Sequence, residues 1–155
     1  MRVSEIVGKR GKSRENLIQI LHDIQDASGD NSLHRDAIEE LAKEMELTVA
    51  DIVGTASFYT MFSLTPRGKH IIRVCESPPC YIMGSENIVQ ALEEKLEIKM
   101  GETTADKMFT LEPTSCLGVC GVAPAMMIND EVFGNLTNQK VSEIIDKIRA
   151  TGSIS

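Results

Sequence analysis

The chain has 155 residues, 42% of them hydrophobic, which is enough apolar material to bury a core and argues against wholesale disorder. Its 16 basic and 23 acidic residues give a net charge of −7, whereas a nucleic-acid binder normally presents a basic face, so no nucleic-acid partner is expected. No apolar run approaches the roughly 18 residues of a membrane span, and residues 1–10 lack the apolar stretch of about 7–15 residues that a secretory signal needs, so we expect a cytoplasmic protein without direct membrane insertion.

The first part of the chain, residues 1–68, predicts a helical domain. Gly29 is a suitable stop for a first helix, Ser32 a possible cap for a second, and Thr48 with Asp51 has the spacing of a capping box for a third. The apolar stripes that recur at helical spacing are Leu17, Ile18, Ile20, Leu21 and Ile24, then Ile38, Leu41, Ala42 and Met45, then Val49, Ile52, Val53, Ala56 and Tyr59.

The pattern changes after residue 68, and residues 69–155 predict a β-α-β-β-α order. The strand candidates are 71–75, 108–111, 125–128 and 132–133, the last of which would return as a hairpin. Residues 88–96 predict a helix with Ser85 as a possible cap, and residues 141–148 predict a final amphipathic helix. The expected fold class is therefore α/β, with a helical N-terminal domain followed by a small layered α/β domain.

All four cysteines of the chain fall into two close pairs. Cys75 and Cys80 are separated by four residues, and Cys116 and Cys120 by three, with 35 residues between the pairs. In a cytoplasmic protein such thiols serve as metal ligands or redox groups more often than as disulfides. The gaps match neither zinc knuckles, four-iron ferredoxins nor the plant-type two-iron motif. Spacing alone leaves a two-iron cluster, a structural zinc site and ordinary buried thiols open.

Each cysteine pair follows a predicted strand, so each is expected on a loop at a sheet edge. Two such loops would face each other across a cluster, with one pair on each iron. Gly118 and Gly121 flank Cys120 and would let backbone N–H groups approach the sulfur atoms. Such hydrogen bonds stabilise the more negative, reduced form of a cluster.

Six segments resemble the NADH-dehydrogenase 24-kDa subunit family of thioredoxin-like [2Fe–2S] ferredoxins. The family includes subunits of respiratory complex I, of NAD-linked hydrogenases and of electron-bifurcating hydrogenases. The likeness runs from about Leu17 to the C-terminus. The segments are GTASFYTMF (54–62), PRGKH (66–70), VCESPPC (74–80), ETTADKMFTLEPTSCLGVC (102–120), APAMMIND (123–130) and LTNQKVSEII (136–145).

The resemblance implies a helical bundle followed by a thioredoxin-like domain, with one [2Fe–2S] cluster on Cys75, Cys80, Cys116 and Cys120. It also implies a partner subunit that holds FMN and the NAD(P) site, and further iron–sulfur subunits. PRGKH favours a soluble NAD-linked or electron-bifurcating hydrogenase-type complex; SPPC and ETTADK favour the peripheral arm of complex I. The chain has no Gly-x-Gly-x-x-Gly fingerprint and no Walker A loop, so we expect no complete active site of its own. A zinc-stabilised structural subunit and a free-standing ferredoxin are the alternatives from other classes.

Several residues outside the four cysteines carry further expectations. Pro78 and Pro79 lack backbone N–H groups, so the first loop would donate fewer hydrogen bonds to sulfur, which by itself lowers the reduction potential. His22, His34 and His70 are expected as surface or packing residues, since none lies at metal spacing from another ligand. Phe58, Tyr59 and Phe62 would pack in a core or dock on a partner; Arg67, Lys69 and Arg73 would be solvated or meet acidic residues of a flavin subunit.

Overall fold

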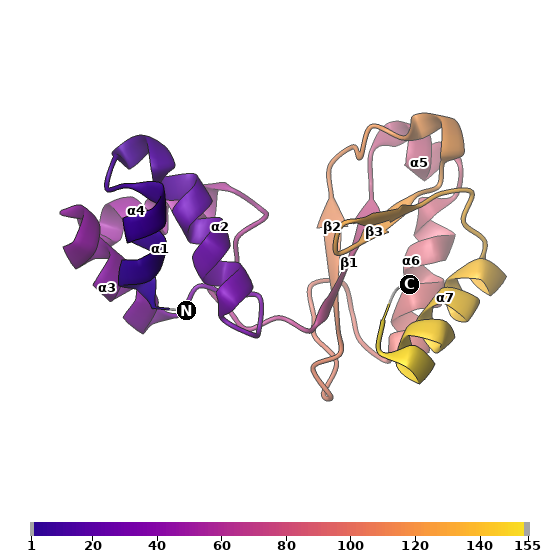
Figure 1. The fold of residues 1–155 in the computed structure, drawn as a ribbon. Helices are drawn as coiled ribbons and strands as arrows, with labels where there is room; N and C mark the ends of the chain where they lie inside the picture. The colour runs from indigo at the N-terminus through magenta and orange to yellow at the C-terminus, as the bar shows by residue number, and fades with distance from the viewer. Residues whose placement is uncertain (1, 154–155) are drawn as a thin grey trace. The chain divides into compact units, whose positions relative to one another are not determined.

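The computed structural model describes residues 2–153, and the chain divides into two compact units, the first ending at Arg67 and the second beginning at Gly68. The outermost residues of the two predicted ranges, 1 and 154–155, lie outside the described residues. The first unit is all-helical (Figure 1). Its elements are α1 (Val3–Arg10), a 3-10 turn at Arg14–Asn16, α2 (Leu17–Ala27), α3 (Arg35–Met45) and α4 (Val49–Phe58).

Of the two helix caps predicted in the first unit, one is confirmed and one is wrong. The Thr48 hydroxyl accepts a hydrogen bond from the Asp51 N–H at 3.1 Å, and the Asp51 carboxylate accepts from the Thr48 N–H at 3.3 Å, which completes the capping box. Ser32 caps nothing, because α3 begins three residues later, after His34. Its buried hydroxyl instead donates to the Asp30 carboxylate at 2.8 Å.

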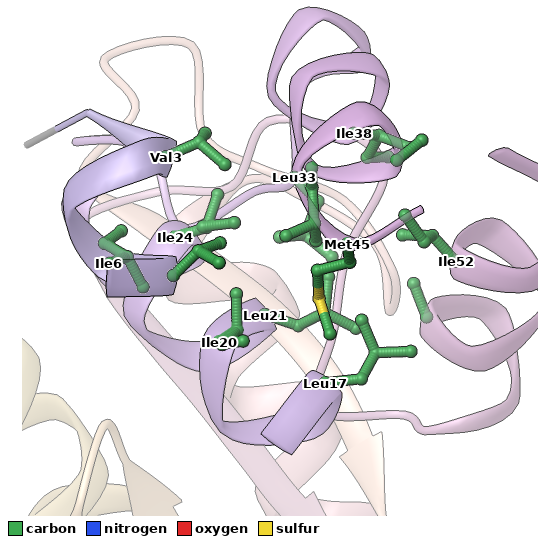
Figure 2. Packing of buried hydrophobic residues seen from close by; sticks show 14 of the residues in the cluster. Val3, Ile6, Leu17, Ile20, Leu21, Ile24, Leu33, Ile38, Met45 and Ile52 are labelled. Atoms are coloured by element: carbon green, nitrogen blue, oxygen red, sulfur yellow. The ribbon is translucent and has the colours of Figure 1, made fainter. Parts of the chain in front are cut away.

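The core of the first unit is built from the apolar stripes of its four helices, as Figure 2 shows from close by. Phe62 is buried with this core, but Phe58 is 77% exposed, so core packing is wrong for Phe58. Arg67 is not a solvated surface residue either. Its guanidinium is buried and donates to the backbone carbonyls of Asn31 at 2.9 Å and Met61 at 3.2 Å, which fastens the end of the unit to its own loops.

The second unit is an α/β layer with a four-stranded mixed sheet in the order β2-β1-β3-β4. β1 and β2 are parallel, while β3 pairs antiparallel with β1 and forms a hairpin with β4. The predicted β-α-β-β-α order is confirmed, with one extra short helix, α5. The elements are β1 (His70–Cys75), α5 (Pro78–Ile82), α6 (Ser85–Leu96), β2 (Phe109–Thr114), a 3-10 turn η2 (Cys120–Val122), β3 (Met126–Ile128), β4 (Glu131–Phe133) and α7 (Asn138–Thr151).

Both long helices cover one face of this sheet, with α6 and α7 side by side (Figure 1). The α6 segment is the crossover that a parallel pair of strands requires. Alternation along β1 directs Ile72 and Val74 into the core beneath these helices and leaves Arg73 and Cys75 on the opposite face. Ser85 is the first residue of α6 and Gly84 holds the cap position, so the predicted cap is wrong.

His70, at the start of β1, is a packing histidine, as predicted, and its environment is unusual. The residue is 3% exposed and its ring lies 5.6 Å from the Phe109 ring. Neither ring nitrogen makes a well-formed hydrogen bond among the described residues, and only the Gly152 backbone opposes the lowering of the pKa. Burial and the charge of the neighbouring Lys69 ammonium lower the pKa of His70 below its usual 6.5. The fold therefore holds this imidazole neutral.

Replacement of His70 by leucine is expected to stabilise the second unit and to weaken its acid sensitivity. Above pH 6.5 the ring is neutral in both states, and removing a buried unsatisfied polar group gains about 1 kcal/mol. As the pH falls below 6.5, His70 becomes protonated in the unfolded state but stays neutral in the folded state. The wild type therefore loses stability until the pH reaches the lowered pKa of His70 in the folded state. Urea unfolding of both chains between about pH 7.5 and pH 5 measures the difference. A constant difference across this range would contradict the expectation.

Candidate metal centre

The parallel pairing of β1 and β2 brings the two cysteine pairs to one edge of the sheet. Cys75 is the last residue of β1 and lies opposite Thr114, the last residue of β2. Two residues after Thr114 the chain reaches Cys116, and Cys120 opens the 3-10 turn η2. The predicted convergence of two segments at a sheet edge is therefore confirmed, but the expectation of two loops is wrong for the first pair, because Cys80 lies within α5.

The short helix α5 has a local cause in the two prolines. Pro78 and Pro79 occupy its first two positions, where the fixed proline φ suits a helix and where the N–H group would be unpaired in any case. This turn of helix carries the Cys80 side chain back toward Cys75, so the two thiols are close enough to hydrogen-bond. The prolines thus shape the site as well as removing N–H donors from it.

The exposed thiols have the spacing that a shared metal ion requires. The Sγ atoms of Cys116 and Cys120 lie 3.7 Å apart. Two thiolates bound at about 2.3 Å to one tetrahedral ion are separated by about 3.8 Å. The Gly118 N–H donates to the Cys116 sulfur at 3.4 Å, and Gly118 reaches this position with a φ of +79°, which glycine adopts without strain.

Cys75 and Cys80 are buried in a small apolar cluster of their own. Both thiols are under 3% exposed and pack with Ala123 and Ala125, while Leu117 and Val119 close over them. Burial raises the pKa of Cys75, but hydrogen bonds from the backbone N–H groups of Ser77 and Leu117 outweigh it, so the pKa is lowered. The Leu117 donor comes from the second cysteine segment, so that segment stabilises a sulfur atom of the first.

The partner thiols are shifted the other way. Burial and the hydrogen bond to the Cys75 thiol raise the pKa of Cys80. The hydrogen bond to Cys116 and the charge of that thiol raise the pKa of Cys120. In each pair one thiol therefore resists ionisation because the sulfur of its neighbour lies beside it. A bound cation removes this conflict, because it favours the thiolate form of every ligand.

The donor set fits a two-iron cluster, which takes cysteines in pairs. It consists of four thiols and no histidine, unlike a Rieske centre, in which two histidines bind one iron. Within residues 2–153, no three side chains among histidine, cysteine, aspartate and glutamate are arranged around a single ion position. A structural zinc ion would draw all four thiolates to one point.

One side of the site opens to solvent through an apolar rim. Cys116 and Cys120 are exposed, whereas Cys75 and Cys80 are not. At the end of α5, two and three residues after Cys80, Ile82 is 80% exposed and Met83 60%. Large apolar side chains that face water around a metal site mark a surface for contact with another protein.

The cysteine geometry and the α/β layer define a class of protein, a small domain that holds a metal–thiolate group at the end of a sheet. A family model described as thioredoxin-like [2Fe-2S] ferredoxin matches residues 3–149, and the chain belongs to this family. The predicted family and the predicted thioredoxin-like α/β fold are thereby confirmed. None of the helices within residues 2–153 is long and apolar enough to cross a membrane.

Relatives of the chain come from two kinds of enzyme complex. It is 39% identical over 136 residues to the E subunit of NADH-quinone oxidoreductase from Rickettsia prowazekii, with 88% of this chain and 77% of that protein covered. It is 35% identical over 130 residues to the HndA subunit of NADP-reducing hydrogenase from Solidesulfovibrio fructosivorans, with 84% of this chain and 75% of that protein covered. A solved NAD+-reducing [NiFe]-hydrogenase matches with a TM-score of 0.80 and 27% identity; the match covers 94% of this chain and 25% of the hydrogenase chain.

Proposed function

We propose that the chain holds one [2Fe–2S] cluster on Cys75, Cys80, Cys116 and Cys120 and passes single electrons within a cytoplasmic, multi-subunit NAD(P)H-dependent oxidoreductase. The observation that carries the proposal is the meeting of the two cysteine pairs at one sheet edge, with Sγ atoms 3.7 Å apart in the exposed pair. Membership of the thioredoxin-like [2Fe-2S] ferredoxin family supports the cluster. Relatives that are named as subunits of larger complexes support the partners.

The division of labour between subunits follows from the chemistry of hydride transfer. When bound, the cluster supplies one-electron redox chemistry, whereas NAD(P)H delivers two electrons as a hydride, so a flavin must stand between them. We place FMN and the NAD(P) site on a partner subunit, with further iron–sulfur subunits beyond it. In this chain the cysteines hold the group, the Leu117 and Gly118 amides stabilise sulfur charge, and the exposed rim at Ile82 and Met83 contacts the flavin subunit.

A soluble hydrogenase-type complex is our first choice of parent assembly, and the peripheral arm of complex I is the second. The solved NAD+-reducing [NiFe]-hydrogenase that matches nearly the whole chain supports the first. The somewhat higher identity to the rickettsial NADH-quinone oxidoreductase protein supports the second. The proteins that copurify with a tagged chain distinguish them: a hydrogenase subunit indicates the first, and quinone-reductase subunits indicate the second.

The cluster is tested by composition and spectroscopy of anaerobically purified protein. We expect two irons and two acid-labile sulfides per chain, a brown colour, and an S = 1/2 EPR signal after reduction with dithionite. Zinc without iron or sulfide would refute the electron-transfer proposal and leave a structural subunit, since zinc has no redox chemistry. A complete cluster without any copurifying flavoprotein would instead support a free-standing ferredoxin.

A further inference from the structure

An ion pair lies on the sheet face that α6 and α7 do not cover. Arg73 of β1 and Glu112 of β2 are direct partners in the parallel register, and the Arg73 Nε lies 3.4 Å from the Glu112 Oε2. The two side chains are 17% and 22% exposed. Arg73 is therefore not free in solvent; its carboxylate partner lies within the same sheet. On the other side of β1, Met127 is the strand neighbour of Arg73.

This pair lies close to the cysteine site. Arg73 precedes Cys75 by two residues on the same strand, so their side chains share one face and their Cα atoms are about 6.6 Å apart. Glu112 belongs to the neighbouring strand, about 4.8 Å to the side, which puts its Cα about 8 Å from that of Cys75. Both charges are thus within reach of any charge held on the thiolates. The Cα atom of Arg73 is the nearer of the two.

The partial burial of the pair decides how strongly these charges act. An exposed charge such as that of Glu76, beside Cys75, is surrounded by water and screened by salt. Arg73 and Glu112 are more than three-quarters shielded, so the effective dielectric around them is lower. Reduction of a [2Fe–2S] cluster adds one negative charge, which Arg73 stabilises and Glu112 destabilises.

We propose that the Arg73–Glu112 ion pair sets the reduction potential of the cluster. The charge of Arg73 raises the potential, and Glu112 is the positioning residue that holds the guanidinium in place and partly offsets its charge. The inference rests on the proposed function, because it requires the cluster. Neither residue binds the iron, and neither lies in the apolar rim. The electron gained on reduction comes from the partner subunit, and the Arg73 guanidinium attracts its negative charge electrostatically.

Charge-removing variants of each partner test the proposal by EPR-monitored redox titration of the anaerobic holoprotein. Glu112→Gln leaves Arg73 uncompensated and is expected to raise the reduction equilibrium constant about tenfold, which for a one-electron couple is about 59 mV. Arg73→Gln is expected to shift the potential downward by a similar amount, whereas Arg73→Lys keeps the charge and stays near the wild type. The double variant with both glutamines is expected to fall between the two single ones.

A second, more exposed ion pair offers a control on the opposite face. The Lys95 Nζ lies 2.7 Å from the Asp146 Oδ1 between α6 and α7, so Asp146→Asn removes a charge without approaching the cysteines and is expected to leave the potential unchanged. A wild-type chain without the EPR signal would overturn the proposed function together with this inference. A wild type with the signal, but with Glu112→Gln and Arg73→Gln unshifted or shifted in the same direction, would overturn this inference alone and make the pair a structural one.

Discussion

Substitution of Cys116 by alanine is expected to abolish the EPR signal and to lower cluster retention more than about 100-fold, since loss of even an outer-shell partner typically costs 10–100-fold in metal affinity. Cys116 is an exposed thiol whose sulfur lies 3.7 Å from that of Cys120. Its removal would take away one of the four proposed ligands on the exposed side of the site. Iron and sulfide analysis of anaerobically purified protein, together with EPR of the reduced sample, measures the loss.

The exposure of Cys116 makes this variant a test of ligation rather than of folding. A surface substitution changes the free energy of unfolding by less than about 0.5 kcal/mol, so the cluster-free variant should be as stable as the cluster-free wild type. Ser115→Ala, an equally exposed change one residue earlier, is the control and should keep the full signal. A Cys116→Ala protein that retains two irons and the S = 1/2 signal would show that the cluster lies elsewhere.

Local signals in the sequence predict much of this fold, and the exceptions have physical causes. The Thr48–Asp51 capping box is confirmed because both of its hydrogen bonds form within four consecutive residues. Ser32 is a similar hydroxyl residue but is buried, and its hydroxyl bonds to Asp30 instead. Whether a serine caps a helix thus depends on tertiary contacts that its neighbours in sequence do not reveal.

The region between Cys75 and Cys80 reads as a loop in the sequence because two prolines normally interrupt regular structure. The signal for a helix is their position, since proline is favoured at the first position of a helix, and Ser77 precedes them with extended backbone, as a residue before a helix does. The convergence of both cysteine pairs is predictable because each follows a strand. Which strands pair cannot be predicted in the same way, because the pairing depends on a parallel register between residues nearly 40 positions apart.

That register also explains why the sequence does not reveal the Arg73–Glu112 pair. The sequence predicts an Arg73 that is solvated or meets an acidic partner subunit, yet its carboxylate partner belongs to the adjacent strand. Lys69 likewise binds within its own unit, where its ammonium donates to the Gly152 carbonyl at 2.9 Å. Charge near a cluster motif therefore does not identify a docking surface until the pairing of strands is known.

Gly134 is a further site residue that the cysteine motif does not indicate. It follows β4 and lies against η2, the turn that begins with Cys120. A Cβ atom added to Gly134 would lie 2.6 Å from the Val122 Cβ and 2.8 Å from the Val122 carbonyl oxygen. The next residue, Asn135, donates its N–H to that same carbonyl at 2.6 Å, so the two segments cannot separate without breaking this bond.

Gly134→Ala is therefore expected to displace η2 and with it the Cys120 sulfur. Overpacking of this kind costs about 1–3 kcal/mol of stability, and a ligand moved from its tetrahedral position binds iron less well. We expect a lower unfolding midpoint in urea and a cluster that is lost at least tenfold faster to an iron chelator, followed by the decay of visible absorbance.

The control for Gly134→Ala is Gly121→Ala. Gly121 is adjacent to Cys120 in sequence, yet a Cβ at this position meets nothing within 4 Å and its φ is not positive. If nearness to the ligand in sequence decided the outcome, Gly121→Ala would be the more damaging change. Because the close approach between backbone segments decides it, the chelator rate of Gly121→Ala should match the wild type while that of Gly134→Ala rises. Equal rates for the two variants would mean that η2 can shift without moving Cys120.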